Sequence, residues 1–217
     1  MADKPTIFAD HSVRSILAGE KTKTRRIVKP QPASPKWTRK RWVEAGSDDT
    51  AHFDLKCPYP VGRILWVREA WAVMRVDYTS LGWEGEGIVE LDSYKSKPAD
   101  RPGECYYPVY RADGYEPCES ESWRTPLFMP RWASRISLKV TAVKAERLQD
   151  ITEEDAVAEG YEAHRAHRDY AMMHYHPYAA TARDNFSYSW DTINKDKGWG
   201  WSENPYVWAV TFELCRP

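Results

Sequence analysis

Most hydrophobic positions in the chain fall into short runs with the two-residue period of β-strands. The clearest run spans residues 62–71, where Ile64 and Trp66 share one face and Leu65 and Val67 share the other. Such alternation is typical of a strand with a buried face. Further strands are predicted near residues 7–8, 24–29, 106–112, 138–143 and 206–214.

The pattern also predicts three helices. Val13, Ile16 and Leu17 share a helical face that follows Asp10, a residue type favoured at the N-cap. Gly19 stands where this helix would end, because glycine readily adopts the left-handed conformation of a helix C-terminus. A second helix is predicted after Thr152, which begins a capping-box pattern, and it would end at Gly160. A third helix is predicted from the helical spacing of three apolar residues, Phe186, Trp190 and Ile193.

Three stretches lack regular periodicity and are predicted to be insertions. They span residues 30–60, with five prolines, residues 75–128 and residues 161–185. Strands interrupted by a few helices, without regular βαβ alternation, indicate an α+β protein built on a small barrel of five or six strands. The length of 217 residues favours a single domain, 1–217, that carries these insertions.

Composition narrows the class of protein. Lys and Arg number 31 against 32 Asp and Glu, so the net charge of −1 argues against a wholly electrostatic nucleic-acid binder. The 11 tryptophans are expected to fill the core for the most part. The four cysteines form no Cys-x-x-Cys pair, which fits a reduced intracellular protein. The chain has neither an apolar leader nor a run long enough to span a membrane, so a cytoplasmic location is predicted.

One segment, residues 21–41, holds nine Lys or Arg residues and no acidic residue. Such a run either binds an anion or forms a solvated face. Lys21 and Thr24 lie at its start, and an amine beside a hydroxyl can make an activated nucleophile. On residue types alone, phosphate binding by this segment is expected in preference to catalysis.

The motif Gly19-x-Lys21-x-x-x-x-Arg26, after a short helix, resembles the signature of the ASCH domain, a PUA-like β-barrel. The segment 148–160 and the closing strand at 210–213 are similar to later elements of that family, and residues 65–69 and 129–135 to longer, phage-associated members. The resemblance covers about half of the chain, in separated blocks. It implies binding of RNA or of a modified nucleobase.

Small bacterial members of the family are amidohydrolases that remove the acetyl group of N4-acetylcytidine. The resemblance places their catalytic Lys, Thr and Glu at Lys21, Thr24 and Glu159. Thr24 would attack the acyl carbonyl, Lys21 would take its proton, and Glu159 would orient the amine or shuttle a proton. No cofactor is implied.

Two physical conditions follow for this chemistry. The pKa of Lys21 must fall well below its ordinary value of about 10.4, because only a neutral amine accepts a proton. Residues three apart point to opposite faces of a strand, so Lys21 and Thr24 converge only if the chain turns between them. Strand geometry is therefore predicted to begin at or after Thr24.

Other side chains are candidates for substrate binding. The arginines among them could grip a phosphate or a base edge, or they could form internal ion pairs, and Trp66 could stack on a base or fill the core. These candidates are Arg25, Arg26, Trp66, Arg68, Glu69 and Arg135. Four histidines at positions 164, 167, 174 and 176 accompany arginines and tyrosines, a composition that favours a solvated segment over a metal site. No metal site is predicted.

Two other functions remain open from the sequence. A non-catalytic RNA-binding module would place residues 21–41 on phosphates and aromatic rings on unstacked bases. Ribonuclease action has been suggested for ASCH relatives, and it would need an acid–base pair that the sequence does not single out.

Overall fold

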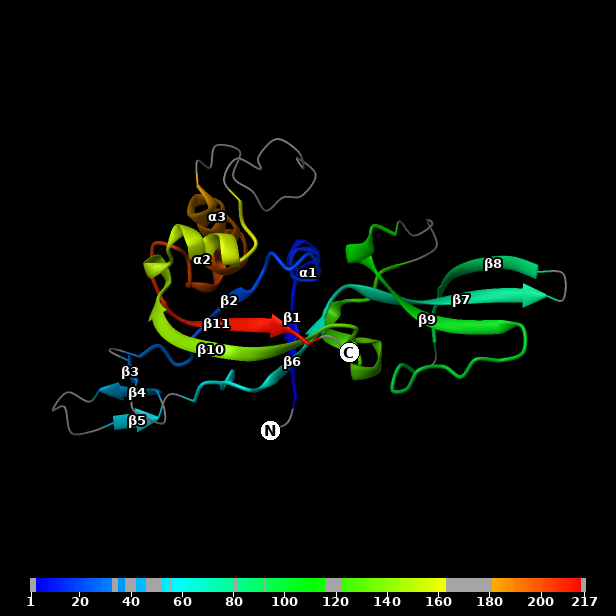
Figure 1. Ribbon diagram of the computed structural model, residues 1–217, viewed down its shortest axis with the longest axis horizontal. Coiled ribbons are helices and arrows are strands. Elements are labelled where there is room, and N and C mark those ends of the chain that lie inside the picture. Colours follow the sequence, from blue (N-terminus) through cyan, green and yellow to red (C-terminus); the bar gives the residue numbers. More distant parts are fainter. Residues whose placement is uncertain are drawn as a thin grey trace. The chain divides into compact units, whose positions relative to one another are not determined.

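The computed structural model describes residues 3–32, 35–37, 42–45, 52–54, 56–79, 82–91, 93–115, 122–162 and 181–215. These residues form a mixed α+β protein (Figure 1). The chain divides into two compact units, and each unit is assembled from segments distant in the sequence. The first unit comprises Met1–Leu17, Ile64–Leu138 and Leu214–Pro217, and the second unit comprises Ala18–Arg63 and Lys139–Glu213.

The first unit is built on two sets of paired strands. Strand β1 (Lys4–Ile7) runs parallel to β6 (Ile64–Arg68), and helix α1 (Asp10–Leu17) follows β1. Strand β7 (Trp71–Thr79) lies between its two antiparallel neighbours in a separate sheet (Figure 1). These neighbours are β8 (Gly82–Val89) and β9 (Glu104–Tyr110).

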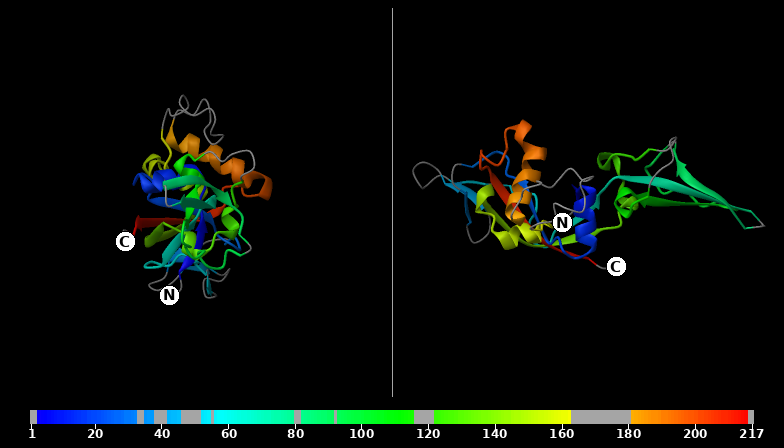
Figure 2. Two further views of the ribbon diagram at one scale, coloured as in Figure 1. Left: turned by 90° about the vertical axis from the view of Figure 1, so that its right-hand side faces the viewer. Right: turned by 90° about the horizontal axis from the view of Figure 1, so that it is seen from above.

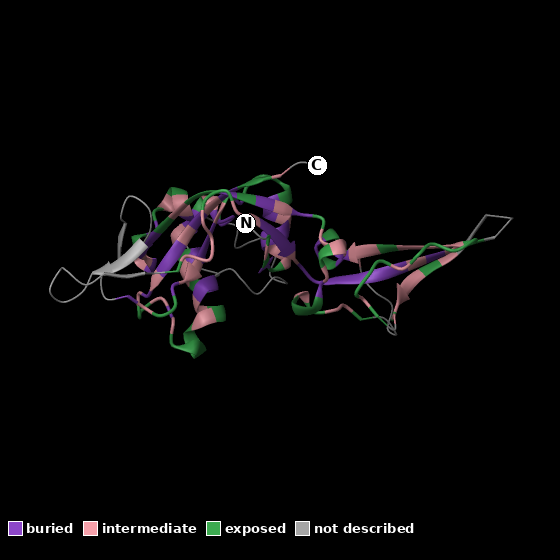
Figure 3. Ribbon diagram, turned by 90° about the horizontal axis from the view of Figure 1, so that it is seen from below, coloured by how far each residue is buried: buried purple, intermediate pink, exposed green. Residues whose placement is uncertain are grey.

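The core of this unit surrounds the start of β7. Trp71 is fully buried and packs with Met129 and Ala133. Met129 follows the short 3-10 turn at Pro126–Phe128, and Ala133 is the last residue of a second turn at Arg131–Ala133. Tyr110 joins them from the end of β9, and its hydroxyl donates to the Ala133 carbonyl at 2.7 Å. In Figure 3 the first half of β7 has the purple colour of buried residues.

The second unit contains an antiparallel sheet and two helices that pack together. Its sheet includes β10 (Ser137–Arg147, from Lys139 onward), β11 (Tyr206–Leu214) and β2 (Lys23–Ile27), with β11 in the middle. Helices α2 (Glu153–Ala158) and α3 (Ala182–Asn194) lie side by side (Figures 1 and 2). A separate antiparallel sheet holds β3 (Pro35–Trp37), β4 (Trp42–Ala45) and β5 (His52–Asp54).

Local sequence fixes how α2 and α3 begin. The Thr152 hydroxyl accepts from the Asp155 amide at the start of α2, as the capping-box pattern predicts. Thr181 and Asp184 form a reciprocal capping box at the start of α3. The Glu153 carboxylate accepts from the amides at positions 182 and 183, so a side chain of one helix also caps the other.

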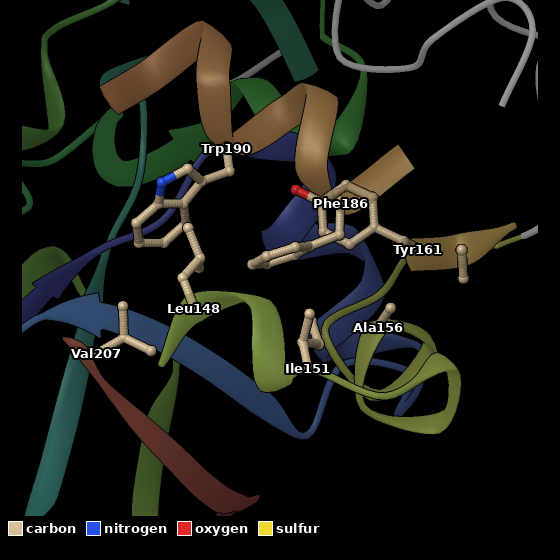
Figure 4. Packing of buried hydrophobic residues seen from close by; sticks show 8 residues of the cluster. Leu148, Ile151, Ala156, Tyr161, Phe186, Trp190 and Val207 are labelled. Atoms are coloured by element: carbon tan, nitrogen blue, oxygen red, sulfur yellow. The ribbon is translucent and has the colours of Figure 1, made fainter. Parts of the chain in front are cut away.

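Aromatic side chains of α3 fill the core between the helices and the sheet (Figure 4). Phe186 meets the Tyr161 ring edge-on with a centroid distance of 5.6 Å and lies 5.9 Å from Trp190. Leu148 is fully buried among them. Phe186 and Trp190, four residues apart, lie on the buried face of α3 as their helical spacing predicts, whereas Ile193, the third residue of that pattern, is 49% exposed.

Two strand predictions need correction. The run 62–71 is not one strand, because β6 ends at Arg68 and β7 starts at Trp71. The Glu69 amide donates to the Met129 sulfur and the Ala70 carbonyl accepts from the Arg111 amide, so both backbone groups leave the strand ladder. Strand β2 begins at Lys23, one residue before the predicted limit at Thr24.

The stretches predicted as irregular insertions contain regular structure. Residues 30–60 include β3–β5, and residues 75–128 include most of the β7–β9 sheet. Of the third stretch, residues 163–180 lie outside the described residues. The described strands form open sheets and no closed barrel. None of the described helices has the length and apolar character that a membrane crossing requires.

The packing around Leu148 predicts a measurable loss of stability. Replacing this fully buried side chain in Leu148→Ala should lower the free energy of unfolding by about 2–5 kcal/mol, because burial is lost and a cavity forms. Ile193→Ala on α3 is the control, since that side chain is 49% exposed and should cost less than about 1 kcal/mol. Urea unfolding followed by circular dichroism measures both. Equal losses in the two variants would contradict this picture of the core.

Candidate active site

The segment that carries Lys21 is held on both sides by backbone hydrogen bonds. The chain turns at Gly19, whose φ of +79° suits glycine. The Thr22 amide then donates to the Ala158 carbonyl at 2.8 Å, and the Thr22 carbonyl accepts from the Phe212 amide at 2.9 Å. These bonds fix Lys21 between the end of α2 and strand β11.

Lys21 and Glu159, 138 residues apart in the sequence, form a buried ion pair. The Lys21 Nζ lies 2.7 Å from Glu159 Oε2, and both side chains are only 4% exposed. The same nitrogen donates to the Glu159 backbone carbonyl at 2.6 Å. Glu159 is the C-cap of α2, so the amine also satisfies a carbonyl at a helix end. A lysine ammonium has three donors, and these bonds use two of them.

Burial lowers the pKa of Lys21 from its ordinary value. The charge and hydrogen bond of Glu159 oppose this effect, and the positive charges of Arg26 and Arg25 add to it. The net direction is the one that a general base requires, because a lower pKa increases the neutral fraction at a given pH.

Arg25 holds three carboxylates on the same side of β2. Its side chain is fully buried, and its Nη2 lies 2.6 Å from Glu146 on β10 and 2.6 Å from Asp155 on α2. Its Nη1 lies 3.3 Å from Glu159 Oε1. The Nε atom is buried without a hydrogen-bond partner. Arg25 therefore joins β2, β10 and α2 through charge and helps to set the position of Glu159.

Asp155 receives a second cation. Lys23, next but one to Arg25 on β2, also pairs with this carboxylate. Burial tends to raise the pKa of Asp155, but hydrogen bonds from Lys23 and Arg25 outweigh it and leave the pKa below its ordinary value. Three cations of the basic segment 21–41 thus face carboxylates of the same unit, which leaves their charges largely neutralised.

Thr24 is buried, at 5% exposure, and pairs with Val210 in the ladder between β2 and β11. Side chains alternate along a strand, so Thr24 points to the face of β2 opposite Lys23 and Arg25. Lys21 precedes the strand and is free of this alternation. The contacts among described residues join Lys21 to Glu159 and join Thr24 to neither of them. The structure thus brings together two members of the expected trio.

Two substrate-binding candidates form an ion pair in the first unit. Glu69 is fully buried and accepts from Arg135 through both oxygens, at 3.1 Å from Nε and 2.9 Å from Nη2. Arg135 also contacts Asp113 at 2.8 Å and stacks 3.9 Å from the Tyr110 ring. Burial raises the pKa of Glu69 despite Arg135, and it raises the pKa of Tyr110 to about 12. This is the internal ion pair that the sequence left open as an alternative.

Trp66 and Arg68 also lie in the first unit. Trp66 is 7% exposed, and the guanidinium carbons of Arg68 and Arg131 lie 4.7 Å and 5.8 Å from its ring centre. Arg68 donates to the Leu127 carbonyl at 2.8 Å. The Trp66 ring is therefore buried close to two arginines, of which Arg131 is half exposed. Arg26, on β2 of the second unit, is partly buried.

Sequence reasoning missed the carboxylates that surround Arg25. Glu146 and Asp155 lie 121 and 130 residues further along the chain. Asp155 stands out only as part of a capping box, and Glu146 belongs to a strand in which nothing distinguishes it from a surface residue. Their pairing with Arg25 arises from the way β10 and α2 fold onto β2.

Metal binding finds no support in the described part of the chain. No group of three or more His, Cys, Asp or Glu residues there is placed to hold a metal ion. The histidines at positions 164, 167, 174 and 176 lie outside the described residues.

Comparisons with known proteins add no relative. Neither protein-family models, nor curated proteins, nor solved structures include a match to this chain. Functional inference therefore depends on the motif that resembles the ASCH domain and on the geometry of the described residues.

The Arg25 cluster predicts a pH-dependent defect when the guanidinium is removed. Arg25→Met leaves buried carboxylates without their partner, so the free energy of unfolding at pH 7 should fall by about 3–5 kcal/mol. Asp155 has a depressed pKa in the folded state, so its contribution is present above the unfolded pKa and is lost as pH falls through the folded pKa. The deficit relative to the unsubstituted protein should therefore stay nearly constant down to about pH 4 and shrink as the pH falls below 3.8, the ordinary pKa of Asp155.

Arg75→Met provides the matched control. Arg75 is 43% exposed and pairs with Asp77 at 3.0 Å, and exposed pairs of this kind contribute about 1 kcal/mol or less. Denaturant unfolding between about pH 2 and pH 7 measures both variants, and the range reaches below the ordinary pKa of Asp155. An Arg25→Met deficit that is small, or that does not vary with pH, would show that the cluster does not stabilise the fold through charge.

Proposed function

We propose that this chain is a PUA-like protein of the ASCH family and acts as an amidohydrolase on N4-acylated cytosine, carried in a nucleoside or in RNA. The observation that carries the proposal is the buried pair of Lys21 and Glu159, with the pKa of the lysine lowered by burial. The family motif names these two positions, and they meet although they are distant in the sequence. Enzyme active sites commonly contain ionisable groups perturbed in this way.

Lys21 serves as the general base in this proposal. Its neutral amine takes the proton of the Thr24 hydroxyl as the Thr24 oxygen attacks the acyl carbon. The new C–O bond gives a tetrahedral intermediate. The C–N bond then breaks, and the cytosine N4 leaves as an amine after accepting the proton from Lys21. Water hydrolyses the resulting ester and restores the Thr24 hydroxyl.

Glu159 and Arg25 position the base. Glu159 holds the Lys21 amine from one side through its carboxylate and its backbone carbonyl, which leaves the third position of the nitrogen for a proton transfer. Arg25 is a positioning residue, because it contacts Glu159 and two further carboxylates. Thr24 pairs with Val210 of β11 and lies on the face of β2 opposite Lys23 and Arg25.

The charge pattern favours this activity over phosphate binding by the basic segment. Lys21, Lys23 and Arg25 each face a carboxylate of the second unit. A surface that binds nucleic acid through phosphates relies instead on cations available to neutralise the phosphates. The start of the basic segment is thus better suited to positioning a reactive amine than to holding a phosphate backbone.

The catalytic roles predict a specific order among variants. Lys21→Arg keeps a positive charge near Glu159 but cannot deprotonate, so it should lower the rate of N4-acetylcytidine hydrolysis by about 10²-fold or more. Thr24→Val removes the hydroxyl at nearly constant volume and should abolish turnover. Thr24→Ser retains the hydroxyl and should retain measurable activity. Release of cytidine, followed by liquid chromatography, measures all three variants.

Each outcome bears on a separate part of the proposal. No cytidine from the unsubstituted protein would exclude the activity and leave RNA binding, with its steep salt dependence, as the better description. Full activity in Thr24→Val combined with loss in Lys21→Arg would exclude Thr24 as the nucleophile and indicate a water activated by Lys21.

The pH profile gives a further prediction. A base is active in its neutral form, so kcat/KM should rise with pH through the folded-state pKa of Lys21. Because burial lowers that pKa, the rise should occur below pH 10.5, the ordinary value for lysine. Initial rates between pH 5 and pH 10 would measure the profile. A flat profile over this range would contradict a base role for Lys21.

A further inference from the structure

The first unit contains a pocket of about 520 Å³ between the segment after β8 and the 3-10 turn at Pro126–Phe128. Its lining includes Tyr94, Arg124 and Phe128, together with the charged residues Glu90 and Lys95. The volume lies within the range of small-ligand sites, roughly 300–1,000 Å³. All the lining residues belong to this unit.

Tyr94 is fixed at both ends. Its hydroxyl oxygen accepts from the Leu91 amide at 2.9 Å, and its backbone carbonyl accepts from Trp132 Nε1 at 2.9 Å. Its ring meets the fully buried Trp71 edge-on, with 5.5 Å between centroids. Trp132 meets Trp71 in the same way at 5.8 Å. The Tyr94 ring is therefore a rigid wall of the pocket.

The guanidinium of Arg124 lies over the Tyr94 ring. Its central carbon is 3.8 Å from the Tyr94 ring centre, and its backbone bridges to Trp71 through two hydrogen bonds of 2.9 Å and 3.4 Å. Its ion pair with Glu90 is long, at 3.6 Å, and Glu90 is 80% exposed. The Nε atom is buried without a partner. A stacked guanidinium with weakly used donors suits a planar or tetrahedral anion, because its fork donates two parallel hydrogen bonds.

The rim adds apolar surface and a second cation. Phe128 is 64% exposed and its neighbour Leu127 is 57% exposed, so both present apolar surface to solvent. Lys95, also in the lining, is exposed. Among the described lining residues, Arg124 and Lys95 are cations and Glu90 is the carboxylate.

We propose that this pocket binds a nucleotide, with the phosphate on Arg124 and Lys95 and the base against Phe128. A phosphate monoester carries a charge of about −1.5 to −2 near pH 7, and two cations match it better than they match a carboxylate. A flat base can stack on an exposed aromatic ring, as in proteins that bind single strands. The same chemistry is offered by a free nucleotide and by the 5′-terminal nucleotide of single-stranded RNA.

Calorimetric titration of the full chain with adenosine 5′-monophosphate tests the site. Adenine is not a substrate of the proposed hydrolase, so its binding is distinct from turnover. Arg124→Gln should weaken binding by about tenfold or more, and Phe128→Ala by about fivefold or more. Glu90→Gln removes the opposing charge and should tighten binding by about two- to fivefold. Opposite signs for Arg124→Gln and Glu90→Gln are the signature of the proposed phosphate position.

Controls separate this pocket from general charge effects and from the hydrolase centre. Arg75→Gln removes an exposed arginine of β7 outside the lining and should leave affinity unchanged, as should Lys21→Arg. Adenosine and inorganic phosphate should each bind more weakly than the nucleotide. Circular dichroism confirms folding, and the exposed positions Glu90 and Phe128 keep the test valid if Arg124→Gln unfolds. A 5′-phosphorylated oligoribonucleotide that binds more tightly than the mononucleotide would identify RNA as the source.

Two results would overturn the proposal. Affinity for adenosine 5′-monophosphate that is unchanged in both Arg124→Gln and Phe128→Ala would place the ligand elsewhere. Equal affinity for adenosine and its monophosphate would remove the assigned role of the cations.

Discussion

The second unit depends on one buried guanidinium. Arg25 meets three carboxylates from two elements, and its side chain has no exposure to solvent. Burying a charge is costly unless partners replace the lost hydration, so the arrangement is stable only while β10 and α2 stay in place against β2. Glu159 is one of these partners, and the position of Lys21 therefore depends on the same arginine.

Lys21 combines a structural contact with a reactive one. Its bond to the Glu159 carbonyl completes the end of α2, and its bond to the Glu159 carboxylate forms an ion pair. Both contacts favour the charged amine, whereas burial favours the neutral one, and burial prevails. The burial of the amine thus determines whether the pKa of Lys21 is low enough for it to act as a base as well as a helix cap.

Local patterns in the sequence predicted part of this structure. The spacing of Phe186 and Trp190 identified α3, and Thr152 marked the start of α2, because these signals arise within one turn or one helical face. Strand β8 gave no such signal, since Gly82–Val89 contains three glycines and little apolar alternation.

Some contacts of the candidate site could be predicted from the sequence and others could not. The resemblance to the ASCH domain predicted that Lys21 and Glu159 act together, but the position of Arg25 among Glu146 and Asp155 depends on contacts across more than 100 residues. Periodicity carries no information about such contacts. Strand alternation, by contrast, could be applied to Thr24 as soon as the start of β2 was known, and it separates this hydroxyl from the face that carries Arg25.

The Leu91 amide and the Trp132 indole already hold both ends of Tyr94. A ligand that binds to Arg124 over this ring would therefore not need to order the Tyr94 side chain. Ordering of side chains is a major cost of association, and here folding has met that cost in advance. Binding at this wall would consequently lose little affinity to the ordering of Tyr94, whereas the exposed side chains of Phe128 and Lys95 would still have to be ordered.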